Sequence, residues 1–198
     1  GAPAVNLLTK TNVSCNGDST GFAQIAVPGV TPPYTYTWYD VNNIPIGQST
    51  ASAFNLYAGT YIGCMEDSTG CKGSVSVTIT QPTNLSAAFT GISATTCFGY
   101  CDGKATLTGT GGTSPYTYQW VDPNSQTTAT ATGLCVGSYN ATLTDSMGCD
   151  TTITVSIATP LAMVASVTTD SAYCGTATGQ ACVNITNGSS PFSYLWND

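Results

Sequence analysis

The chain contains an internal repeat, and this periodicity limits the folds that are open to it. The segment TPPYTYTW at residues 31–38 returns as TSPYTYQW at 113–120 and as SSPFSYLW at 189–196. A second segment, ending in Asp-x-x-Gly-Cys, closes at Cys71 and again at Cys149. The period is about 78–82 residues, which predicts repeats at 1–82, 83–160 and 161–198. The third repeat is expected to be incomplete, so we expect the natural chain to continue in both directions.

Within each repeat, residues typical of β-strands alternate and are separated by turn residues. In the second repeat we expect strands near residues 85–91, 104–109, 116–121, 128–134, 138–144 and 151–158, with one further short strand left open. No segment has the periodicity of a helix. Short strands with frequent turns over about 80 residues predict an all-β fold of tandem immunoglobulin-like β-sandwich repeats in a rod-like array.

The composition argues against several classes of function. The chain has no His and no Arg, only 7% of its residues are charged, and its net charge is −7. General acid–base catalysis most often uses His, and a negative chain repels nucleic acid. We therefore expect no enzyme activity, no catalytic residue, no cofactor and no nucleic-acid partner. No run of about 18 apolar residues is present, so no membrane insertion is expected.

Nine cysteines indicate an oxidising compartment, and hence an extracellular or cell-surface location. No pair has the C-x2-C spacing of a thiolate metal site, so no metal site is expected. The repeat places Cys15 and Cys97 early in their repeats, and Cys71 and Cys149 in the late Asp-x-x-Gly-Cys turn. We expect disulfides within each repeat, namely Cys15–Cys71, Cys97–Cys149 and Cys101–Cys135.

Three cysteines have no obvious mate within the sequence. Cys64 is unassigned, although a bond between Cys64 and Cys71 remains open. Cys174 and Cys182 lie in the third repeat, so their mates are expected outside residues 1–198.

Each repeat carries alternating aromatic residues directly after a proline, and alternation places them on one side of a strand. A sugar-stacking platform is one interpretation. The core strand of a sandwich is favoured, because the pattern recurs in every repeat. The predicted core residues are Tyr34, Tyr36, Trp38, Tyr116, Tyr118, Trp120, Tyr194 and Trp196, with Phe192 at the place of the first Tyr in the third repeat.

In order and spacing, the motifs resemble the SprB repeat. The second repeat shows them in full, as Cys97, Gly99, Gly103, Ala105, Gly111, Gly112, Pro115, Tyr116, Tyr118, Trp120, Leu134, Gly137, Tyr139, Asp145, Gly148, Cys149, Ile157 and Pro160. The first repeat has Val30-Thr31 in place of the double glycine. The resemblance implies a very large surface protein of Bacteroidota, exported by type IX secretion and serving adhesion or gliding motility.

The Asp turns at Asp67 and Asp145 allow two further interpretations. Calcium binding is disfavoured because one carboxylate per loop is poor provision, and an Asp accepting local backbone hydrogen bonds fits better. Five Asp-Ser/Thr steps also resemble the acceptor pattern for O-glycans in Bacteroidota. The candidate O-glycosylation sites are Ser19, Ser68, Ser146, Thr151 and Ser171.

These observations predict a structural or adhesive repeat segment of a cell-surface fibre, with neighbouring repeats of the same chain as its partners. One alternative is a multi-chain filament or hook-like appendage, because scarce charge suits packing of identical chains side by side. A second alternative is a carbohydrate-binding module that contacts surface glycans. Its exposed aromatic candidates are Tyr39, Tyr57 and Tyr100.

Overall fold

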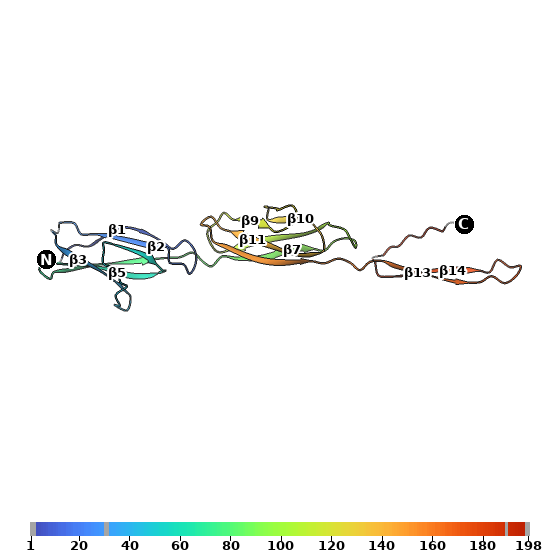
Figure 1. The fold of residues 1–198 in the computed structure, drawn as a ribbon, viewed down its shortest axis with the longest axis horizontal. Coiled ribbons are helices and arrows are strands. Elements are labelled where there is room, and N and C mark those ends of the chain that lie inside the picture. The colour runs from blue at the N-terminus through green and yellow to red at the C-terminus, as the bar shows by residue number, and fades with distance from the viewer. Residues whose placement is uncertain (1–2, 30–31, 189, 197–198) are drawn as a thin grey trace. The chain divides into compact units, whose positions relative to one another are not determined.

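A computed structural model describes residues 3–29, 32–188 and 190–196. Every regular element in this part of the chain is a β-strand, as Figure 1 shows. It therefore contains no helix long and apolar enough to cross a membrane. The chain divides into two compact units. The first comprises Gly1–Ala87, Gly109–Thr117 and Thr142–Thr152, and the second comprises Ala88–Thr108, Tyr118–Ala141 and Ile153–Asp198.

Two three-stranded sheets form a sandwich in the first unit. Strands lie in the orders β1-β2-β4 and β3-β5-β6, so the first, second and fourth strands pair in one sheet and the third, fifth and sixth in the other. This is the division of an immunoglobulin-like domain, in which neighbouring strands along the chain cross between sheets. The bounds are β1 Asn6–Thr11, β2 Gly21–Ala26, β3 Tyr34–Asp40, β4 Ser52–Leu56, β5 Gly59–Asp67 and β6 Lys72–Ile79.

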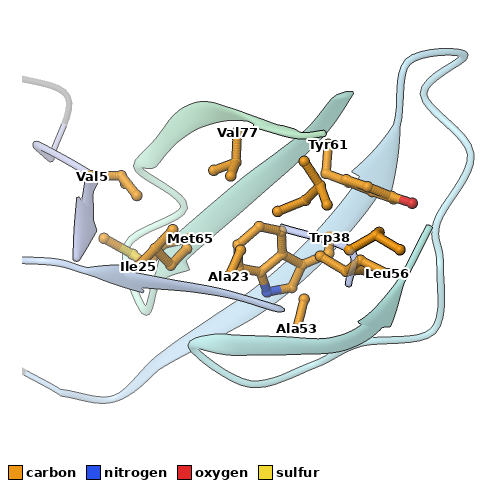
Figure 2. Close-up of a cluster of buried hydrophobic side chains, with 11 residues drawn as sticks. Val5, Ala23, Ile25, Trp38, Ala53, Leu56, Tyr61, Met65 and Val77 are labelled. Atoms are coloured by element: carbon orange, nitrogen blue, oxygen red, sulfur yellow. The ribbon is translucent and has the colours of Figure 1, made fainter. Parts of the chain in front are cut away.

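The core of this sandwich surrounds Trp38, which is fully buried. Figure 2 shows its indole among side chains of both sheets, including Ala23 and Leu56. The indole Nε1 donates a hydrogen bond of 2.9 Å to the Thr50 carbonyl, so its one polar group is satisfied. Across the sheet Trp38 pairs with Gly63, where an added Cβ would lie 3.0 Å from the indole. The large ring therefore fits because its neighbour has no side chain.

The second repeat has the same strand orders, β7-β8-β10 and β9-β11-β12, with its strands divided between the two units. Trp120, the counterpart of Trp38, is fully buried and donates a bond of 2.9 Å to the Thr128 carbonyl. All six predicted strands are present, which confirms the all-β immunoglobulin-like fold. Their bounds are β7 Ser86–Ser93, β8 Gly103–Thr110, β9 Thr117–Trp120, β10 Thr130–Leu134, β11 Gly137–Thr144 and β12 Asp150–Ile157.

The third repeat contributes one antiparallel hairpin to the second unit, formed by β13 (Val164–Asp170) and β14 (Gln180–Thr186). Here the predicted core residues are placed differently. Tyr194 is 53% exposed and Trp196 is 55% exposed, because residues 190–196 form no strand and no second sheet covers them in the described chain.

Candidate functional site

The most distinctive local feature of the molecule is a disulfide between residues of two different repeats. Cys15 bonds to Cys149, 134 residues later, with their Cα atoms 5.7 Å apart. Both cysteines lie in the first compact unit and both are half-buried. We call their surroundings the junction, meaning residues 15, 16, 18, 82–85, 112 and 148–151, which together line a hollow of about 480 Å³.

This bond corrects the predicted pairs Cys15–Cys71 and Cys97–Cys149. Cys71 stands directly before β6, whereas the loop that carries Cys15 meets the other end of that strand, where the Val13 amide donates 2.9 Å to the Thr80 carbonyl. Eight residues of strand separate these points by about 27 Å. The two cysteines of one sandwich therefore lie at opposite ends of it, and no disulfide spans that distance.

The second repeat repeats this arrangement of cysteines around its last strand. Cys149 stands directly before β12, and the Thr95 amide, two residues before Cys97, donates 3.0 Å to the Ala158 carbonyl just past the end of β12. Each of the first two repeats therefore has a loop cysteine and a turn cysteine at the two ends of its last strand. The predicted pairing fails for the same physical reason in both repeats.

Residues 82–85, which we call the linker, are hydrogen-bonded on both sides. Asn16 of the first repeat donates its Nδ2 to the Pro82 carbonyl at 2.9 Å. Gly112 of the second repeat donates its amide to the Thr83 carbonyl, also at 2.9 Å. The backbone between the first two repeats is thus held by side-chain and main-chain bonds in addition to the disulfide.

The Asp turn of the second repeat holds the backbone that carries Cys149. Asp145 is only 5% exposed, and its Oδ1 accepts the amides of Met147 and Cys149 at 2.9 Å each. Its Oδ2 accepts the Thr113 amide at 2.8 Å, from a turn 32 residues earlier. Burial by itself would raise the pKa of the Asp145 carboxyl, but the amides of Thr113, Cys149 and Met147 hold it below its ordinary value. The turn that presents Cys149 is therefore fixed by a buried carboxylate.

The double glycine of the second repeat is required by this close packing. Gly111 and Gly112 have φ of +74° and +58°, which other residues rarely adopt. A Cβ on Gly111 would lie 2.0 Å from the Asn84 carbonyl oxygen, and one on Gly112 would lie 2.6 Å from Oδ2 of Asp145. The glycines thus let the second repeat approach the linker and let the Thr113 amide reach the buried carboxylate.

The remaining cysteines fall into two groups. Cys101 and Cys135 form a disulfide within the second unit, at the predicted pair. The thiols that are free among the described residues are Cys64, Cys71, Cys97, Cys174 and Cys182. Burial on β5 raises the pKa of the Cys64 thiol, with Lys72 acting in the opposite direction, so Cys64 is a weak nucleophile.

The first and second repeats each contain a hydrogen bond from a tyrosine hydroxyl that the sequence did not lead us to predict. Tyr61 near the start of β5 donates its hydroxyl to the Tyr57 carbonyl at 3.1 Å, and Tyr139 near the start of β11 donates to the Cys135 carbonyl at 3.1 Å. This is the tyrosine corner of immunoglobulin-like domains. The repeated Gly-x-Tyr sequence was the signal available for it.

The other predicted residues have diverse surroundings. Among the alternating aromatic residues predicted for the core, four tyrosines are half-buried, namely Tyr34, Tyr36, Tyr116 and Tyr118. The rings of Tyr34 and Tyr36 meet edge to face, with their centroids 5.5 Å apart. Ser68 and Ser171 are exposed, Ser19 and Thr151 are half-buried, and exposed Ser146 donates its Oγ to the Thr113 carbonyl at 2.9 Å. Tyr57 and Tyr100 are exposed and Tyr39 is half-buried, at separate places on the strands and loops.

The described residues contain no group of three His, Cys, Asp or Glu side chains that could hold a metal ion. Asp67 and Asp145 accept the backbone amides of their own turns, as the turn sequence predicted. The site offers covalent and hydrogen-bonded attachment between successive repeats.

Several solved structures align with the chain at low sequence identity. The three N-terminal domains of the Highly Immunogenic Outer Capsid protein (Hoc) of bacteriophage RB49 align with a TM-score of 0.52 and 16% identity, over 96% of this chain and 71% of that one. A C-terminal 282-residue fragment of intimin, in complex with the intimin-binding domain of its translocated receptor, gives 0.45 and 14%, over 82% and 66%. Dpr2 Ig1-Ig2, in complex with DIP-Theta, gives 0.35 and 13%, over 84% and 70%. No curated protein sequence matches the chain.

The likeness to Hoc shows the fold alone, and the strand orders define the class as tandem immunoglobulin-like sandwiches. The SprB repeat family matches the chain at residues 7–43 and 93–125. These stretches contain Cys15 and Cys97 with the aromatic motifs that follow them. These two matches confirm the resemblance to the SprB repeat found in the motifs.

Proposed function

We propose that this chain is a load-bearing segment of a cell-surface adhesive fibre, and that its repeats transmit tension rather than perform catalysis. The Cys15–Cys149 disulfide carries the proposal. The second disulfide, Cys101–Cys135, supports an extracellular location, because such bonds are rare in reducing compartments. The SprB match supports a surface protein.

The position of the bond suggests how tension would pass through the chain. When the chain is pulled from its ends, the residues between Cys15 and Cys149 lie within a closed covalent loop, and the bridge bypasses them. If both sandwiches unravelled, these residues would add nothing to the extension while the bond, with its sequence separation of 134, remained. At about 3.4 Å per residue, the bridge withholds about 450 Å of chain. The linker bonds from Asn16 and Gly112 hold the same junction when the load is low.

Single-molecule pulling of the 198-residue chain tests this role. Under oxidising conditions we expect full extension to be about 450 Å shorter than under reducing conditions, because only residues outside the loop lengthen. A Cys101→Ser variant is the matched control, since it removes the disulfide whose sequence separation is 34 and leaves the larger loop intact. Equal extensions with and without reductant would contradict the load-bearing role.

Adhesion requires a separate test on cells that carry the full-length protein. Antibodies against residues 1–198 are expected to label intact cells, and mild reduction is expected to weaken attachment under flow more than attachment at rest. Labelling only after lysis would contradict the surface location. If mild reduction weakened attachment under flow and attachment at rest to the same extent, the mechanical role would be contradicted.

A multi-chain filament is the second candidate, and an aromatic pair on the outer face of a sheet favours it. Phe22 on β2 and Phe54 on β4 have ring centroids 5.1 Å apart on the outer face of their sheet, and Phe54 is exposed. With 7% charged residues, few ions would need desolvation if identical chains packed on this face. Class averages of native fibres in cross-section decide the matter, since a ring of sandwiches supports the filament and a single sandwich contradicts it.

A further inference from the structure

Two of the free cysteines occupy the same repeat positions as the two bonded ones. Cys97 stands 82 residues after Cys15, matching the spacing of the two buried Trp residues, and Cys71 stands 78 residues before Cys149. Both free thiols are exposed. The first two repeats therefore contain one loop cysteine and one turn cysteine that are not bonded, and each is equivalent in position to one cysteine of the Cys15–Cys149 disulfide.

The surroundings of Cys97 repeat most of those of Cys15. A hollow of about 440 Å³ within the second unit is lined by Cys97, and most of its other lining residues correspond to residues that line the first hollow. Pro160 and Met163 stand where Pro82 and Leu85 stand, and Gly188 precedes Trp196 by eight residues, as Gly112 precedes Trp120. The first hollow has in addition residues 148–151, which bring the bonded Cys149. The hollow at Cys97 therefore has the form of the first junction without the turn that completes it.

The turn that carries Cys71 is built like the turn that carries Cys149. Oδ1 of Asp67 accepts the Thr69 amide at 2.8 Å and the Cys71 amide at 2.9 Å, as Asp145 accepts the amides of Met147 and Cys149. The same backbone conformation therefore presents the Cys71 thiol at the end of its sandwich.

We propose that Cys71 and Cys97 form disulfides with adjoining repeats, so that the Cys15–Cys149 bond is one rung of a ladder linking every repeat to the next. Cys97 would bond a turn cysteine of the Asp-x-x-Gly-Cys type, presented by the repeat to which β13 and β14 belong. Cys71 would bond a loop cysteine of the Cys-x-Gly type in a repeat on its other side. Both mates lie outside residues 1–198.

Each rung forms by thiol–disulfide exchange with an extracytoplasmic oxidoreductase that carries an accessible disulfide. The Cys97 thiolate attacks that disulfide, and the turn thiolate then displaces the oxidoreductase, which leaves as a dithiol. The two protein thiols are oxidised to one disulfide, and the oxidoreductase disulfide is reduced by the same two electrons.

The ladder deepens the proposed load-bearing function and rests on it. Cys71 and Cys97 both lie inside the loop closed by Cys15 and Cys149. Bridges from these two residues to neighbouring repeats would therefore produce overlapping covalent loops, and no stretch between repeats would depend on the linker alone. Unravelling of any single sandwich would then leave the length of the fibre almost unchanged.

Counting free thiols in the full-length protein from the cell surface tests the ladder. The protein is denatured without reductant and alkylated, and the added mass gives the number of free thiols. If Cys97 is bonded, Cys97→Ser leaves its former mate unpaired and raises the number by one. If Cys97 is free, the same variant lowers the number by one, which overturns the proposal. Cys71→Ser is read in the same way.

Cys64→Ser is the matched control. Cys64 is free, so its replacement removes one free thiol and should lower the number of free thiols by one. Peptide mapping identifies the mates, since chymotrypsin cleaves after exposed Phe98 and Tyr100 and separates Cys97 from Cys101. An endoprotease that cleaves before Asp67 separates Cys64 from Cys71. A Cys64–Cys71 peptide overturns the proposal for Cys71. Should Cys71 and Cys97 prove free while Cys15–Cys149 and the pulling result hold, the ladder fails and the load-bearing function stands.

Discussion

Replacing Asp145 by Asn is expected to destabilise the second repeat by about 2–4 kcal/mol. The carboxylate accepts two amides through Oδ1 and one through Oδ2, and it is almost fully buried. An Asn side chain has one acceptor, its carbonyl oxygen, and an NH2 group in place of the second carboxylate oxygen. Whichever way its amide is turned, an N–H group faces a backbone N–H, and at least one buried donor loses its partner. The estimate combines one unsatisfied buried donor with the loss of charge assistance in the other bonds.

Asp150→Asn is the matched control for this substitution. Asp150 is exposed, lies one residue beyond Cys149, and has no side-chain hydrogen bond within the described residues. It removes the same charge from the same end of β12 and should change stability by less than about 0.5 kcal/mol. Amide hydrogen exchange of β9 and β11 across a urea titration reports the free energy of unfolding of the second repeat in the 198-residue chain. Equal effects of the two substitutions would refute the reasoning.

The pH dependence of stability gives an independent check. The pKa of Asp145 is lower in the folded state than its unfolded value of about 3.9. Its contribution is therefore complete above that value and is lost as the pH falls through the folded pKa. The difference in stability between the parent chain and the Asn variant should shrink as the solution is acidified below pH 4. A difference that stays constant over this range would show that the carboxylate charge is not involved.

Three further substitutions test other parts of the architecture. Gly112→Ala should cost about 1–3 kcal/mol in the same urea titration, because the new Cβ meets Asp145 at 2.6 Å in a strained conformation, and an unchanged midpoint would contradict this. Tyr139→Phe should cost about 1 kcal/mol by thermal unfolding, because the half-buried Cys135 carbonyl loses its donor. Cys15→Ser should accelerate proteolysis of the linker about tenfold, corresponding to about 1.4 kcal/mol in local opening, and an unchanged rate would mean that the linker bonds suffice.

The strands and the buried tryptophans were predictable because their signals are local. In β12, inward and outward residues alternate so that Val155 and Ile157 are buried while their neighbours are exposed. Trp38 and Trp120 occupy the same place in the first two repeats, on the third strand of each sandwich, and a side chain of that size facing inward there fills the core. Alternation and size are properties of a segment itself, so they can be read without knowing what packs against it.

The junction was not predictable in the same way, because its partners come from different repeats. Similar spacings, Cys15 to Cys71 and Cys97 to Cys149, suggested bonds within a repeat, and spacing contains no information about which end of a sandwich each residue occupies. The direction of the last strand contains that information. The turn cysteine lies just before this strand, and the loop that carries the other cysteine is hydrogen-bonded just past its end through Val13 or Thr95, so the two cysteines lie about a strand length apart.

The sequence motif of the second repeat gains a physical explanation at this junction. Gly112 permits the approach of the linker and the Thr113 amide, Asp145 fixes the turn, and the turn positions Cys149 against Cys15. These residues are spread over 134 positions, yet each depends on the others for its geometry. A repeat that required only a sandwich core would need Trp and the alternating strands, but not a buried Asp, a double glycine and two cysteines at opposite ends. The spacing of the motif is therefore better explained by attachment between repeats than by the stability of a single repeat.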